Sequence, residues 1–200
     1  MNYSRLIIIL AFTLSCCSTN EYSLRSDPIL ANYFSKSDIR DLQQILNFFE
    51  NEICTDTSTS IKNCYDNFFD HLRSLEDLSD FKGLISNKKQ VELLNSLNPG
   101  LFNAIWYYRT DYVPRLGDSL KSIHFKWPGK YFSFLDTLAR NDEAIANYVE
   151  TLTLVGDISP YFTSYAMMNS PEFQLKYERT RLIIAINFLT LNEELRLNSH

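Results

Sequence analysis

Apolar side chains recur at three- and four-residue steps along most of the chain from residue 36 onward, which is the spacing of a helix that buries one face. Ser37 precedes the first such segment as an N-cap, and the apolar stripe of that segment is formed by Ile39, Leu42, Leu46, Phe49 and Ile53. A second segment follows the polar connector 55–60, with a stripe formed by Ile61, Cys64, Tyr65, Phe68, Phe69, Leu72 and Leu75. Because the connector is short, we expect these two helices to pack antiparallel.

Proline, glycine and asparagine divide the rest of the chain into further helical segments. We expect helices over residues 86–97, 101–113, 130–140, 144–155, 161–168 and 171–196. Within the last helix, residues 182–191 are apolar on nearly every side, which is typical of a helix at the centre of a bundle. This run is too short to span a bilayer. Residues 121–127 alternate only briefly, so we expect no strand there.

Two arginines, Arg179 and Arg181, stand just before this apolar run. One of them must lie near the core, and a buried guanidinium needs a carboxylate partner. Glu178 and Asp157 are the candidates in the sequence.

The N-terminus has a different pattern. Arg5 precedes a short apolar stretch over residues 6–14, which is typical of a signal peptide. The residues that follow, Ser15-Cys16-Cys17, resemble a bacterial lipobox. This resemblance implies that diacylglycerol is attached to a cysteine sulfur, that the chain is cleaved before that cysteine, and that the new amine is acylated. Such acyl chains would hold the protein on a membrane.

Cys16 fits the lipobox best because the small residue Ser15 precedes it, and Cys17 is the alternative. The polar segment 18–26 carries no acidic run, which favours the periplasmic face of the envelope. Plain secretion and an uncleaved anchor are the other interpretations. The expected organisation is a signal peptide and lipobox over 1–16, a tether and entry segment over 17–35, and one α-helical domain over 36–200.

Composition supports an all-α fold, an irregular bundle of about seven to nine helices. Glycine is scarce, at 5 of 200 residues, whereas all-β folds need many tight turns. The net charge is −5 and no basic tract is present, so we expect no nucleic-acid partner.

Two cysteines lie outside the lipobox, Cys54 and Cys64. An exported chain enters an oxidising compartment, where paired thiols persist as disulfides. Their spacing is neither that of a redox pair nor that of a zinc half-site. We therefore expect a disulfide across the turn between the first two helices, and two free buried thiols are the alternative.

Catalytic motifs are missing from the sequence. It has three histidines, His71, His124 and His200, and no metalloprotease, nucleophile-elbow or phosphate-loop pattern. We expect no metal, no cofactor and no assigned catalytic residue. An envelope enzyme that uses His124 with a carboxylate is an alternative, because His124 lies in the least regular part of the chain.

Aromatic residues make up 14% of the chain. They are densest at Trp106, Tyr107, Tyr108 and Tyr112, a patch that also includes Arg109. Tyrosine and tryptophan beside arginine are common in recognition surfaces. The same spacing also fits a buried helix. A second aromatic and methionine cluster spans residues 161–168, with the same two interpretations.

These observations predict a membrane-anchored lipoprotein that binds a protein or peptide partner in the cell envelope. The candidate binding residues are Trp106, Tyr108, Arg109 and Tyr112. A small-ligand or glycan binder with Trp106 and Tyr112 in an aromatic groove is a further alternative.

Overall fold

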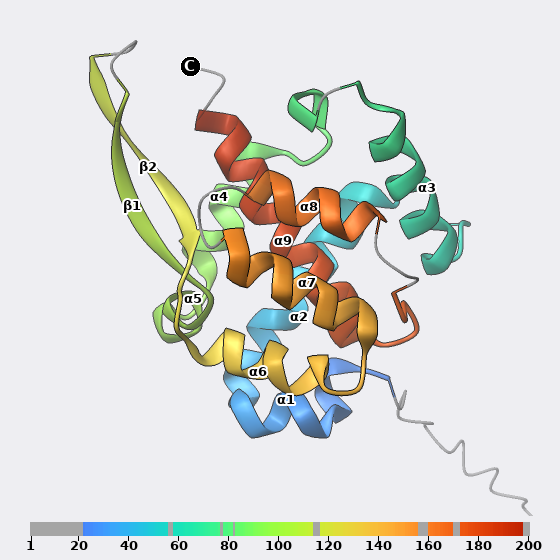
Figure 1. The fold of residues 1–200 in the computed structure, drawn as a ribbon. Coiled ribbons are helices and arrows are strands. Elements are labelled where there is room, and N and C mark those ends of the chain that lie inside the picture. Colours follow the sequence, from blue (N-terminus) through green and yellow to red (C-terminus); the bar gives the residue numbers. More distant parts are fainter. Residues whose placement is uncertain are drawn as a thin grey trace, which may run out of the picture.

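The computed structural model describes residues 22–55, 58–76, 78–81, 83–113, 117–155, 160–169 and 173–197. Within these residues the chain forms nine α-helices and one two-stranded antiparallel sheet (Figure 1). The helices are α1 (Pro28–Tyr33), α2 (Lys36–Ile53), α3 (Ile61–Ser74), α4 (Asn87–Ser96), α5 (Pro99–Ile105), α6 (Lys130–Ala139), α7 (Glu143–Val155), α8 (Pro160–Asn169) and α9 (Glu178–Leu197). The strands are β1 (Trp106–Val113) and β2 (Asp118–Phe125), and short 3₁₀ turns lie at η1 (Leu24–Ser26) and η2 (Leu78–Phe81). The predicted all-α class is confirmed.

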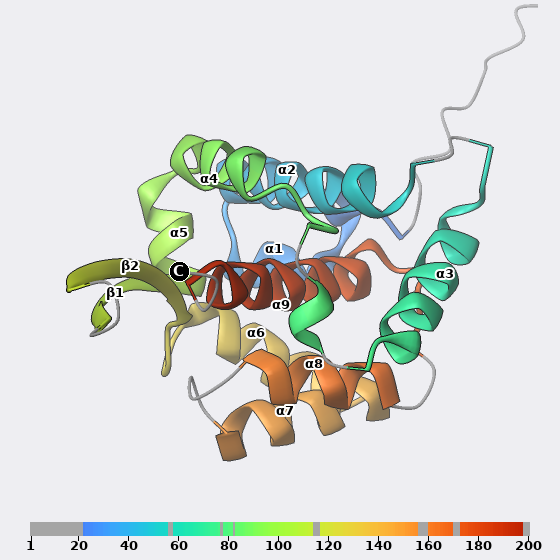
Figure 2. The same cartoon turned by 90° about the horizontal axis from the view of Figure 1, so that it is seen from above.

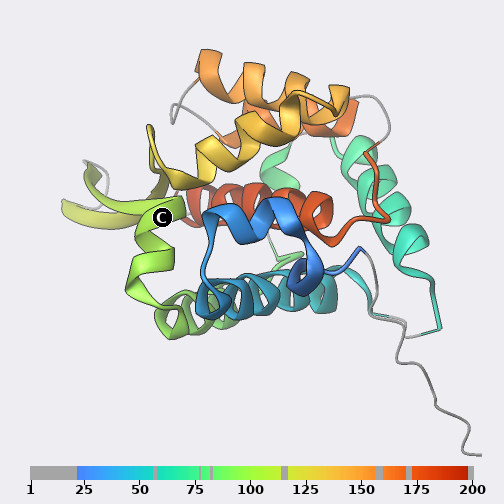
Figure 3. The same ribbon diagram turned by 90° about the horizontal axis from the view of Figure 1, so that it is seen from below.

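The long helix α9 lies in the middle of the molecule. Figures 2 and 3 show α2 and α4 on one side of it and α6, α7 and α8 on the other. Every residue from Thr180 to Glu193 is buried, because a helix covered on all sides has no face left for water. The prediction that the apolar run 182–191 forms the centre of the bundle is confirmed.

Polar side chains on α9 join it to the surrounding elements. The amide of Asn187 accepts hydrogen bonds from Tyr148 of α7 and Thr163 of α8, and donates one to Ser164 over 2.7 Å. Near the other end, Asn192 donates to Gln90 of α4 over 2.9 Å. Buried polar groups are costly unless they are bonded, so these contacts select one arrangement of helices around α9.

Helix boundaries follow local capping. The first long helix begins two residues earlier than expected, because Ser35 rather than Ser37 is its N-cap and forms a capping box with Asp38. The predicted break between α6 and α7 is confirmed, since the Asp142 carboxylate accepts the backbone N–H of Ile145.

The predicted helix over 101–113 is wrong. It ends at Ile105, and the chain continues as β1, which pairs with β2 over the segment for which we expected no strand. The result is a β-hairpin that extends away from the helical body (Figure 1).

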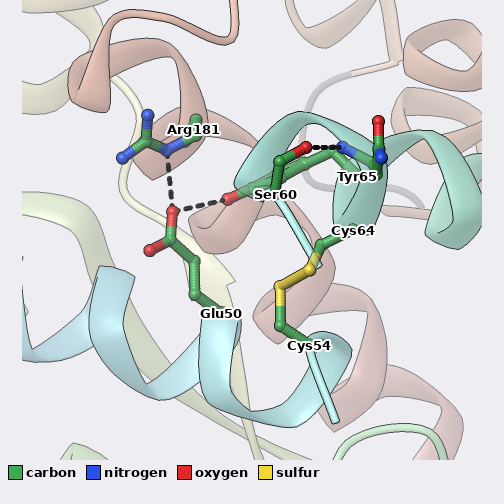
Figure 4. Close-up of a disulfide and its surroundings, with 7 residues drawn as sticks. Glu50, Cys54, Ser60, Cys64, Tyr65 and Arg181 are labelled. Atoms are coloured by element: carbon green, nitrogen blue, oxygen red, sulfur yellow. Dashed lines mark hydrogen bonds and ion pairs between the residues drawn. A yellow bond between two sulfur atoms is a disulfide. The ribbon is translucent and has the colours of Figure 1, made fainter. Parts of the chain in front are cut away.

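The disulfide between Cys54 and Cys64 is confirmed (Figure 4). Cys54 caps the C-terminus of α2 and Cys64 lies in the first turns of α3, with a Cα–Cα distance of 5.4 Å. The bridge closes the turn between these helices, as the spacing predicted.

A largely buried ion pair lies beside the disulfide. Arg181 Nε donates to Glu50 Oε1 over 2.7 Å, and the Tyr65 hydroxyl donates to the same oxygen over 3.3 Å (Figure 4). Glu178 Oε1 lies 3.8 Å from Arg181 Nη2, so the expected partner is present but is not the nearest one. Asp157 lies outside the described residues. Burial raises the pKa of Glu50, although Arg181 opposes that shift.

The described chain begins at the N-terminal end of α9. The backbone N–H of Glu178 donates to the carbonyl of Tyr22, and Arg179 pairs with Asp27 over 2.7 Å. Leu24 and Leu30 are buried, so within the expected tether and entry segment 17–35 the chain contributes to the core from Leu24 onward. A helix as long as α9 spans about 30 Å, which places this entry and the hairpin at opposite ends of the molecule.

No helix in the described ranges combines the length and the apolar character that crossing a membrane requires.

Candidate partner-binding hairpin

The hairpin begins where α5 ends. Asn98 and Pro99 start α5, and the backbone of Trp106 then becomes extended while its N–H donates to the Phe102 carbonyl. The sequence from Trp106 to Val113 is rich in aromatic and β-branched residues, which favour strands. Gly117 has a positive φ of 65°, a conformation that glycine adopts readily, and leads into β2.

Three buried side chains hold the root of the hairpin, namely Trp106, Ile123 and Phe125. Trp106 is fully buried and its indole Nε1 donates to Thr190 Oγ1 of α9 over 2.9 Å. Thr190 in turn donates to the Ile186 carbonyl, so both polar groups are satisfied. Trp106 is therefore a structural anchor, and its predicted place on a binding surface is wrong.

The backbone register shows which edge of the hairpin is exposed. The pairs run from Trp106–Phe125 at the root to Val113–Asp118 at the tip without a bulge. Lys126 N–H donates to the Ile105 carbonyl over 2.9 Å, which makes Ile105 and Lys126 a hydrogen-bonded pair. Hydrogen-bonded pairs alternate along an antiparallel ladder, so the odd-numbered residues of β1 bond to β2. The N–H and C=O groups of Tyr108, Thr110 and Tyr112 consequently point away from β2.

The outer edge of β2 is covered by α9. Arg196 Nη2 donates to the Lys121 carbonyl over 3.2 Å, and the same guanidinium pairs with Glu193 at 2.7 Å. This ion pair raises the pKa of Arg196, whose charge is thereby held at the C-terminal end of α9. The edge formed by β1 is the outer one in Figure 1.

Tyr108 and Tyr112 share one face of β1 because they are four residues apart and alternate residues of a strand face the same side. Tyr108 is 41% exposed; its ring stacks on Phe102 at 4.7 Å, and Lys121 Nζ lies 3.8 Å above the ring centroid. Partial burial and the charge of Glu193 raise the pKa of the Tyr108 phenol. Tyr112, nearer the tip, is 65% exposed. Arg109 is also exposed, but strand alternation places it on the opposite face.

His124 lies on the face of the hairpin that carries Arg109. Its Nε2 is 2.8 Å from the Ser122 hydroxyl, and its ring contacts Tyr107 at 5.8 Å. A serine within hydrogen-bond distance of a histidine is the first requirement of a nucleophile–base pair. Ser122 is only 2% exposed, however, and neither residue lines the cavities described below. This geometry gives little support to the envelope-enzyme alternative.

Exposed aromatic residues also occur on α8, where Phe162 and Tyr165 are exposed while Met167 and Met168 are buried. The segment 161–168 thus fits both the core and the surface interpretation, because one of its faces is buried and the other is exposed. A cavity of about 330 Å³ lies between Tyr165 and the end of α3, and another of about 510 Å³ lies between Ile61 and Phe173. Neither of these two cavities includes Trp106 or Tyr112.

Cys16 and Cys17 lie outside the described residues. Among the residues that the structure does describe, no group of three or more histidine, cysteine, aspartate or glutamate side chains is arranged to hold a metal ion.

Comparison with known proteins adds no assignment: we found no protein-family model, no curated protein and no solved structure that matches this chain.

Proposed function

We propose that this chain is a lipid-anchored protein of the cell envelope that binds a protein or peptide partner through its hairpin. The lipobox-like sequence around Cys16 and Cys17 motivates the anchor. The hairpin motivates the binding function, and the observation that carries it is the outer edge of β1.

An exposed strand edge is a ready template for another strand. Proteins usually protect such edges with charged side chains, proline, a bulge or a covering element, and of these β1 has only the charges of Arg109 and Asp111. β1 spans eight residues, contains no proline and pairs with β2 without a bulge. Its outward-facing backbone groups at Tyr108, Thr110 and Tyr112 lie beside the exposed rings of Tyr108 and Tyr112. An edge of this kind fits an added strand.

The position of the hairpin fits a tethered protein. The described chain enters at the N-terminal end of α9, whereas the hairpin packs on the C-terminal half of that helix. A protein anchored a few residues before Tyr22 would present its hairpin at the end remote from the anchor.

The anchor is tested with three full-length variants, Cys16→Ser, Cys17→Ser and the double variant. We expect one single variant and the double variant to leave the membrane fraction, and the mass of the mature N-terminus to include acyl chains. An unmodified mature N-terminus, or a double variant that still sediments with membranes, would overturn the lipid anchor.

The binding surface is tested by placing a photo-reactive amino acid at Tyr112 in cells. Tyr165 of α8 provides a matched control, because it is similarly exposed but belongs to a different element. We expect one covalent product of defined mass from position 112, and its loss when Thr110→Pro is added. Equal products from positions 112 and 165, or none from position 112, would contradict the proposal.

A further inference from the structure

The centre of β1 is complementary to itself. Around Thr110 the sequence reads Tyr108-Arg109-Thr110-Asp111-Tyr112. If two copies of this strand run antiparallel with Thr110 opposite Thr110, the position opposite Arg109 is Asp111 of the other copy. The position opposite Tyr108 is Tyr112. Opposite charges and aromatic pairs directly across two strands are both stabilising.

The backbone of β1 fits the same register. Tyr108, Thr110 and Tyr112 are the residues whose N–H and C=O groups point to the outer edge, as the bond from Lys126 to Ile105 indicates. Pairing about Thr110 matches each of these residues with another outward-facing residue. Each such pair exchanges two backbone hydrogen bonds. Arg109 and Asp111 then fall at the non-hydrogen-bonded positions, where side chains on neighbouring strands come closest.

Other registers lose this complementarity. Pairing centred on Arg109 or Asp111 would place like charges opposite each other. Pairing centred on Tyr108 would place Arg109 opposite Tyr107, and pairing centred on Tyr112 would place Asp111 opposite Val113. Neither register joins opposite charges. Among these registers, only the one centred on Thr110 both pairs the outward-facing backbone groups and places Arg109 opposite Asp111.

We infer that the partner of the outer edge is a second copy of this chain, which pairs β1 with β1 about Thr110 to form a four-stranded sheet. The interface is isologous, because the same strand contributes both halves and closes the dimer. The inference deepens the hairpin-binding part of the proposed function and requires no lipid. Confinement of anchored copies to one membrane would raise their effective concentration and favour the dimer.

A cysteine at position 110 tests the contact directly. Across a hydrogen-bonded antiparallel pair the Cα atoms lie about 5.5 Å apart, within the range that a disulfide spans. Full-length Thr110→Cys should therefore form a covalent dimer under mild oxidation in cells. Ser119→Cys is the matched control, since Ser119 is exposed near the same tip but lies on β2. The unaltered chain controls for cross-links through Cys16 or Cys17.

Charge reversal tests the register. Arg109→Asp and Asp111→Arg each place like charges opposite each other, so each should weaken dimerisation by roughly tenfold or more. The double variant restores opposite charges and should recover most of the affinity. Dimerisation of the detergent-solubilised full-length chain is followed by analytical ultracentrifugation, and circular dichroism confirms that each variant is folded.

The results separate this inference from the proposed function. A Thr110→Cys chain that stays monomeric while its thiol remains reactive, or a double variant no better than the single ones, would overturn the self-pairing. If position 112 still cross-links to a product that is not twice the mass of the chain, the hairpin binds another protein. If position 112 forms no product at all, the binding function itself fails.

Discussion

Trp106 Nε1 donates to Thr190 Oγ1 over 2.9 Å, and this bond joins the first residue of the hairpin to the buried central helix. Both groups are inaccessible to water, so neither has solvent as an alternative partner. The hairpin therefore projects from a fixed point on α9, although a two-stranded sheet has little stability of its own.

Replacing Thr190 with valine removes the acceptor and leaves the Trp106 N–H unpaired in the core. We expect Thr190→Val to lower the free energy of unfolding by about 1–3 kcal/mol. Thr190→Ser retains the hydroxyl and should keep more of the stability. Urea unfolding followed by tryptophan fluorescence measures both variants. Equal stability of the valine variant and the unaltered chain would show that this bond does not hold the hairpin root.

The Glu50–Arg181 pair makes a prediction about pH. Arg181→Met leaves the largely buried Glu50 carboxylate without its cation, which should cost up to about 3–5 kcal/mol at pH 7. Burial already raises the pKa of Glu50, and loss of Arg181 raises it further. Because the pKa of the folded state then lies above that of the unfolded state, the folded state binds the proton more tightly. The loss in free energy of unfolding of Arg181→Met, relative to the unaltered chain, should therefore shrink as the pH falls from 7 toward 5.

The control for this prediction is the double variant Glu50→Gln with Arg181→Met, which has no carboxylate at position 50 to titrate. Its deficit relative to the unaltered chain should not shrink in the same way over that pH range. Thermal unfolding at several pH values gives the comparison. A deficit of the single variant that stays constant or grows on acidification would contradict the buried-pair account.

The disulfide makes a simpler prediction about stability. Cys54 and Cys64 are separated by 10 positions, so their bond restricts a short loop of the unfolded chain. The chain-entropy model gives about 2–3 kcal/mol for such a loop. We expect Cys54→Ser with Cys64→Ser to lose that amount in denaturant unfolding. Under reducing conditions the unaltered chain should lose the same amount, whereas the double variant should be insensitive to reductant.

The sequence predicted the helical part of the fold well, because helical periodicity and capping are local signals. The apolar run 182–191, the break near Asp142 and the pairing of Cys54 with Cys64 all follow from residues close together in the chain. The nearest partner of Arg181 could not be predicted in this way. Glu50 lies 131 residues away, and only the packing of α2 against α9 brings it close.

The hairpin was missed for a physical reason. A strand is easiest to recognise when one face is buried along its whole length, because apolar and polar residues then alternate. Only the root of this hairpin is buried, so Tyr112 shares a face with the core residue Trp106 although it is exposed. Tyr108 and Tyr112 are also four residues apart, which equally fits one face of a helix. The pairing of Ser122 with His124 follows only once the strand is known.

The central claim, that β1 offers its outer edge to another strand, is tested most directly by residue-resolved hydrogen exchange of the full-length chain. Exchange is measured at concentrations below and above the association detected by ultracentrifugation. We predict that the Tyr108, Thr110 and Tyr112 amides exchange rapidly at low concentration and become protected at high concentration. The Tyr107 and Arg109 amides, which bond to β2, should be protected at both. Even-numbered amides that exchange equally at both concentrations, although the chain has associated, would contradict the account.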